Sequence, residues 1–83
     1  MHAPRGIGRL EWVPVSMVLD RRVVDRLRRH RNRLGLRGAM SARWVWDRRG
    51  EATLEIRAER FVFAEIVDYG RDGRADAVFV ARR

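Results

Sequence analysis

Residues 42–56, ARWVWDRRGEATLEI, contain two segments of strand-forming residues joined by a turn signal. The segment Asp47-Arg48-Arg49-Gly50 is typical of a type I turn followed by a glycine bulge. If Asp47 pairs with Glu51, the apolar residues of both strands share one side of the sheet, whereas a slip of one residue divides them between two sides. We therefore expect Trp46 opposite Ala52, Trp44 opposite Leu54 and Ala42 opposite Ile56, with Arg43–Glu55 and Val45–Thr53 pairs on the other side.

An amphipathic helix is predicted upstream of this hairpin, over residues 21–34. Asp20 is a suitable N-cap because its carboxylate can accept a hydrogen bond from a free amide of the first turn. Gly35 stands where a residue in the left-handed conformation would end the helix. The apolar residues form a narrow stripe expected to face the core, namely Val23, Val24, Leu27 and Leu34.

Two further segments have strand character. Residues 7–19 are apolar and β-branched, but Pro14 cannot donate a ladder hydrogen bond, so this strand is expected to lie at an edge or to break there. Residues 61–68 are apolar at successive positions, which favours a central strand that is buried on each side.

A last strand is predicted over residues 75–81, after a tight turn at Asp72-Gly73. A two-residue turn pairs Tyr69 with Asp76. The expected fold is therefore α+β, an antiparallel β-meander of four to five strands packed against one helix, in the order β-α-β-β-β-β. Residues 1–6 are expected to be a flexible lead-in, and residues 7–83 a single small domain.

The chain has 83 residues, no cysteine and two histidines, His2 and His30. A domain this small buries only about 60 % of the surface of its unfolded chain, so self-association into a homodimer is one way to gain burial. Disulfides are excluded, and the histidines lie in different segments, so no zinc site is predicted. We expect neither a metal nor another cofactor.

The charge of the chain is strongly positive. All 19 basic residues are arginine, against 11 acidic residues, which gives a net charge of +8. Such an excess attracts polyanions, and the guanidinium group suits bidentate contact with phosphate or carboxylate. The partner that we expect is nucleic acid; the alternative is an acidic protein surface.

No segment reaches the ~20 apolar residues needed to cross a bilayer, so no membrane partner is expected. Residues 1–8 lack the apolar centre of a signal peptide. Together with the absence of cysteine, this favours the cytoplasm of a bacterium or of a phage-infected cell.

The candidate binding residues are arginines on one helix face and at one hairpin tip. Four of them recur at steps of four, three and four, which makes a continuous stripe able to follow a phosphate backbone. The alternative is a solvated outer face, paired in part with Asp25 at helical spacing. The predicted set is Arg21, Arg22, Arg26, Arg28, Arg29, Arg33, Arg48 and Arg49.

Catalytic residues are not predicted, because no histidine is placed by sequence beside Ser16, Ser41, Thr53 or Tyr69. The chain is therefore expected to be a non-enzymatic binding protein. Pairs of aromatic residues at a spacing of two could stack on RNA bases, but core packing is the favoured interpretation. These pairs are Trp44 with Trp46 and Phe61 with Phe63.

Residues 60–83, with a strand, the Asp72-Gly73 turn, a second strand and a terminal arginine pair, resemble the C-terminal end of RelE/ParE-type toxins. That resemblance implies a small basic toxin that acts on RNA or on a host enzyme, with Arg60, Arg82 and Arg83 as the residues to test. The helical hairpin of that family needs a second helix, whereas this sequence predicts a single helix. Three hypotheses thus remain: a nucleic-acid-binding protein, a phage or mobile-element protein that binds an acidic host protein, and such a toxin.

Overall fold

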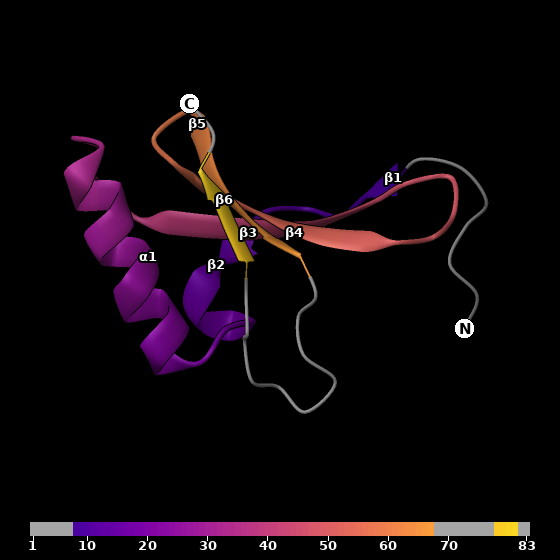
Figure 1. Ribbon diagram of the computed structural model, residues 1–83, viewed down its shortest axis with the longest axis horizontal. Coiled ribbons are helices and arrows are strands. Elements are labelled where there is room, and N and C mark those ends of the chain that lie inside the picture. The colour runs from indigo at the N-terminus through magenta and orange to yellow at the C-terminus, as the bar shows by residue number, and fades with distance from the viewer. Residues whose placement is uncertain (1–7, 68–77, 82–83) are drawn as a thin grey trace.

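The computed structural model describes residues 8–67 in full and residues 78–81 by their backbone. One α-helix packs against an antiparallel sheet, which confirms the predicted α+β class and the order β-α-β-β-β-β (Figure 1). The elements are β1 (Gly8–Arg9), β2 (Val13–Pro14), a 3₁₀ turn η1 (Val15–Met17), α1 (Arg21–Arg33), β3 (Met40–Trp46), β4 (Ala52–Ala58), β5 (Phe61–Val67) and β6 (Val78–Ala81).

The hairpin of β3 and β4 has the predicted register. Trp46 pairs with Ala52 and Trp44 with Leu54, and the Arg43–Glu55 pair lies between them. The turn is closed by hydrogen bonds from the Gly50 amide to the Asp47 carbonyl and from the Asp47 amide to the Glu51 carbonyl, both 3.0 Å long. Gly50 has φ +80°, the left-handed value that the glycine bulge requires.

The N-terminal apolar segment forms two short edge strands and not one continuous strand. β1 and β2 both pair with β3, and the chain leaves the sheet at Pro14 to enter η1. The expected edge position and the expected break at this proline are therefore both present, because proline lacks the amide that a further ladder bond would use.

β5 lies between β4 and β6 in the sheet order β1-β3-β4-β5-β6. The pairs Ile56–Ala64 and Arg57–Val62 leave Phe63 as the extra residue of a β-bulge. Phe63 is fully buried, whereas Phe61 is 56 % exposed. The prediction that both phenylalanines pack in the core, and that this strand is buried on each side, is therefore wrong for Phe61, which pairs with Ala58 at the first position of β5, next to the exposed turn at Glu59 and Arg60.

The backbone of β6 pairs with β5, and Val67 lies opposite Val78. The predicted Tyr69–Asp76 pair belongs to this same register but lies outside the described residues, as does the Asp72-Gly73 turn.

α1 begins after Asp20, whose Oδ1 accepts a 3.0 Å hydrogen bond from the Val23 amide, and Gly35 follows its end with φ +75°. Both end signals are as predicted. The helix packs on one face of the sheet, near one end of the β3–β4 hairpin (Figure 1). Between them lies the core, which consists of Val15, Leu19, Val23, Val24, Leu27, Met40, Ala42, Leu54, Ile56, Ala58, Phe63, Ala64 and Ile66.

Candidate functional site

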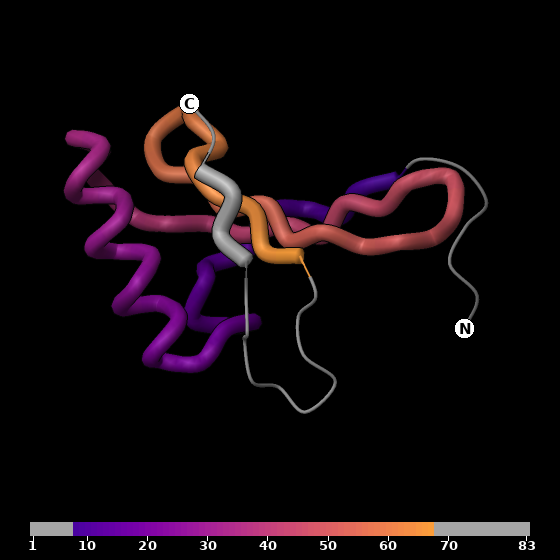
Figure 2. The backbone as a smooth tube through the Cα atoms, in the orientation of Figure 1, coloured from indigo at the N-terminus to yellow at the C-terminus, as the bar shows by residue number. Residues whose placement is uncertain are grey.

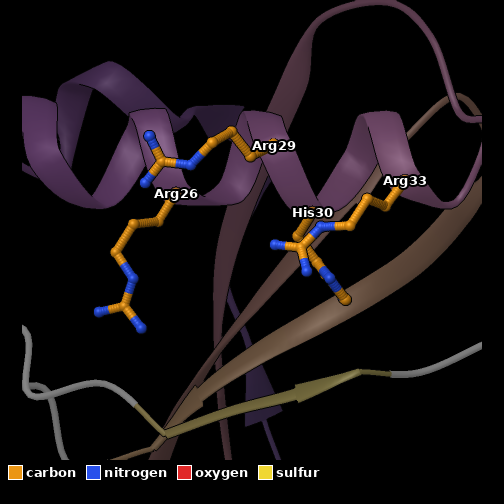
Figure 3. A pocket seen from close by; sticks show the side chains of 4 residues that line it. All are labelled: Arg26, Arg29, His30 and Arg33. Carbon is orange, nitrogen blue, oxygen red and sulfur yellow. The ribbon is translucent and has the colours of Figure 1, made fainter.

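One flank of α1 carries a row of basic side chains. Arg26, Arg29, His30 and Arg33 line an open hollow of about 290 Å³ beside the helix. Arg26 extends away from the helix, whereas Arg33 extends back along it toward His30 (Figure 3). Arg22 precedes Arg26 by one turn, so its side chain lies on the same flank. We call Arg22, Arg26, Arg29 and Arg33 the basic flank.

The basic flank contains cations without a carboxylate partner. Arg22, Arg29 and Arg33 are exposed, and none of the three forms an ion pair within the described part of the chain. Three positive charges along one helix edge repel one another, so an anion bound there would lower the free energy of this surface.

His30 separates the basic flank from the core. Its ring lies against Phe63, with 5.9 Å between the ring centroids. Its Nε2 atom is buried and makes no hydrogen bond to any described residue. Such a buried polar atom without a partner costs about 1–3 kcal/mol. His30 thus lies at the edge of the core.

The opposite flank of α1 differs in its electrostatics. Arg21 and Arg28 border a second hollow together with Asp25, and the Arg28 guanidinium forms a 3.0 Å ion pair with the Asp25 carboxylate. The structure thus divides the six predicted helix arginines into two groups on either side of the helix. Among the described lining residues, Asp25 borders the hollow beside Arg21 and Arg28, and no acidic residue borders the hollow beside Arg29 and Arg33.

Arg31 stabilises the chain after α1. Its guanidinium donates hydrogen bonds to the Gly38 carbonyl and to the Asn32 side-chain oxygen. This arginine therefore holds the loop that leads into β3, which accounts for its position between core-facing residues on the helix.

The sheet face opposite α1 holds an arrangement that the sequence did not predict. The guanidinium carbons of Arg43 and Arg57 lie 4.3 and 4.2 Å from the centre of the Trp12 ring. Arg43 also donates a 2.8 Å hydrogen bond to Glu55, and these two side chains are only 20 % and 12 % exposed. Both arginines are thus engaged within the protein.

The hairpin tip lies far from the basic flank. Arg48 and Arg49 are exposed at the end of the hairpin opposite to α1, and the backbone tube shows the same separation (Figures 1 and 2). The Arg49 amide donates a 2.8 Å hydrogen bond to the Asp47 carboxylate, which fixes the turn. The structure therefore brings four predicted site residues together on the basic flank and leaves the tip as a separate basic region.

No cluster of three or more histidine, aspartate or glutamate side chains in the described ranges 8–67 is placed to hold a metal ion. No helix within that part of the chain is long and apolar enough to cross a bilayer.

Comparison of the chain with protein-family models, curated proteins and solved structures finds no match. Of the residues implied by the resemblance to RelE/ParE-type toxins, Arg60 is exposed at the turn between β4 and β5. Arg82 and Arg83 lie outside the described residues. α1 is the one α-helix within the described ranges.

Proposed function

We propose that this protein binds nucleic acid without catalysis, through contacts between the basic flank of α1 and backbone phosphates. The observation that carries the proposal is the unneutralised charge of Arg22, Arg29 and Arg33 on one exposed helix edge. Guanidinium groups form bidentate hydrogen bonds with phosphate oxygens, and displacement of counterions from the nucleic acid adds to the affinity.

The distribution of the other arginines supports this choice of surface. Arg28 pairs with Asp25, Arg31 bonds to a loop carbonyl, and Arg43 and Arg57 lie over Trp12. Contacts to phosphates alone carry no sequence information, so binding with little sequence preference is expected. The hairpin tip provides a second, weaker contact in this proposal because it holds two arginines at a separate end of the molecule.

The test compares two charge reversals of equal size. The double variant Arg29→Glu/Arg33→Glu changes the basic flank, and Arg48→Glu/Arg49→Glu changes the hairpin tip. Fluorescence anisotropy with a labelled DNA duplex and a labelled RNA, across a salt series, measures the nucleic-acid affinity of each variant. Both variants alter the net charge equally, so a difference in affinity between them reports where the contact lies. We expect the flank variant to lose more than tenfold in affinity and the tip variant to lose much less, because the main phosphate contacts are placed on the flank.

Thermal unfolding is the control, because exposed side chains of this kind contribute little to stability. An equal loss of nucleic-acid affinity in both variants would show that net charge alone determines binding and would refute a defined binding surface. A wild-type protein that binds neither DNA nor RNA at low salt, but binds an acidic polypeptide, would refute nucleic-acid binding in favour of an acidic protein partner.

A further inference from the structure

The hollow beside α1 is small and its described lining is entirely basic. Its volume, about 290 Å³, lies just below the range of roughly 300–1,000 Å³ in which proteins hold small organic molecules. Arg26, Arg29, His30 and Arg33 line it, and no carboxylate is among them. An occupant that fits this composition is compact and anionic.

The lining favours an anion with more than one charge. Arg29 and Arg33, both exposed, border the hollow with two guanidinium groups (Figure 3), whereas an internal phosphodiester brings a single negative charge. A phosphate monoester carries about −1.5 to −2 at neutral pH and has three oxygens free to accept hydrogen bonds. A monoester therefore matches both the charge and the number of donors better than an internal phosphodiester does.

His30 supplies a second, independent observation. Its buried Nε2 atom has no hydrogen-bond partner among the described residues, and the same side chain lines the hollow. Arg33, which extends toward His30, is exposed (Figure 3). When Nε2 carries the ring proton, it would donate a hydrogen bond to a phosphate oxygen at the bottom of the hollow once Arg33 contacts the phosphate from outside.

We infer that this hollow binds the terminal phosphate of a nucleic-acid strand, so that the protein prefers phosphorylated ends over internal backbone. This inference rests on the proposed function, because the remainder of the strand lies along the basic flank. Arg33 and Arg29 hold the phosphate from the solvent side, and His30 contacts it from the core side.

The experiment measures the affinity of the whole chain for two DNA duplexes of one sequence, one with 5′-phosphates and one with 5′-hydroxyl ends. We expect the phosphorylated duplex to bind on the order of tenfold tighter, the effect of one additional charge-assisted contact. Arg33→Gln and His30→Leu should each reduce this ratio to about one. Arg48→Gln is the matched control and should leave the ratio unchanged. Inorganic phosphate should compete away the preference before it abolishes binding.

Three results would overturn the inference. Equal binding of both duplexes by the wild type would refute the end preference while leaving the proposed function intact. A preference that survives Arg33→Gln, His30→Leu and the additional variant Arg29→Gln would place the phosphate elsewhere. Binding to neither duplex would refute the proposed function itself. Circular dichroism of each variant separates a lost contact from a lost fold.

Discussion

Gly8 and Trp46 pair at the edge where β1 meets β3, and their contact leaves no room for a side chain on Gly8. A Cβ atom at this glycine would overlap the indole ring of Trp46. An aromatic side chain that covers a glycine on the neighbouring strand shields the backbone from water and fixes the pairing of the two strands. The indole Nε1 of Trp46 is buried and has no hydrogen-bond partner among the described residues, so this ring is held by packing.

Gly8→Ala should therefore destabilise the protein by about 1–3 kcal/mol, the usual cost of overpacking a closely packed site. Urea denaturation followed by tryptophan fluorescence measures this loss. Arg9→Ala, at the next and exposed position, is the control and should change the free energy of unfolding by less than about 0.5 kcal/mol. A Gly8→Ala variant as stable as the wild type would show that the Trp46 ring moves aside without cost.

At the scale of elements, the segment from β1 to β2 is attached to the sheet by few contacts. Two pairs join β1 to β3, two more join β2 to β3, and the Leu10 amide donates a 2.9 Å hydrogen bond to the Trp44 carbonyl. Trp12, between the two strands, contacts Arg43 and Arg57 on the face away from α1. This side chain therefore holds the segment on that face.

Trp12→Ala should destabilise the protein by about 2 kcal/mol, from lost cation–π contacts and lost burial of the ring. Trp12→Phe retains an aromatic face and should lose roughly half as much. Thermal denaturation of both variants gives the comparison. A Trp12→Phe variant that is no more stable than Trp12→Ala would show that an aromatic ring beside Arg43 and Arg57 does not by itself stabilise the protein.

The helix ends and the hairpin register could be predicted because each depends on neighbours in the sequence. Asp20 caps the first turn of α1, and Gly50 adopts the conformation required by the turn after Asp47. The bulge at Phe63 could not be predicted, because it depends on how β5 fits beneath a helix distant in sequence.

The candidate site could be predicted in composition but not in arrangement. Helical spacing alone places Arg22, Arg26, Arg29 and Arg33 on one face. The two hollows beside α1, of which only one has a carboxylate among its described lining residues, could not be placed from the sequence. The Trp12 contacts likewise required the path of the N-terminal segment, because Trp12 meets residues about 30 to 45 positions later only in the folded chain.

Across the described part of the molecule, exposed arginines gather at two ends, with single exposed arginines elsewhere at Arg9, Arg37 and Arg60. The basic flank lies at the end formed by α1, and Arg48 and Arg49 lie at the hairpin tip (Figure 1). Between these ends, the sheet face opposite α1 holds Arg43 and Arg57 against Trp12 and Glu55. Among the described residues, the basic flank is therefore the larger group of exposed arginines, and the hairpin tip is the smaller one.

Each phosphate contact should appear in the salt dependence of binding. On B-DNA, every neutralised phosphate contributes about −0.9 to the slope of log affinity against log salt concentration. Arg29→Gln should reduce the magnitude of the slope by about one. Arg60→Gln, exposed at the turn between β4 and β5, removes the same charge and should leave the slope nearly unchanged. Equal changes in both variants would contradict a contact at Arg29.

The pairing of β1 and β2 with β3 also has a consequence for the order in which the chain folds. α1 and the β3–β4 hairpin form from neighbouring residues, whereas the N-terminal edge strands must close a loop that includes the entire helix. Contacts that close long loops are formed late, because their entropy cost is paid before they stabilise anything. The first strands in the sequence are thus expected to be the last to join the sheet, and Trp12 is the side chain whose burial marks completion of folding.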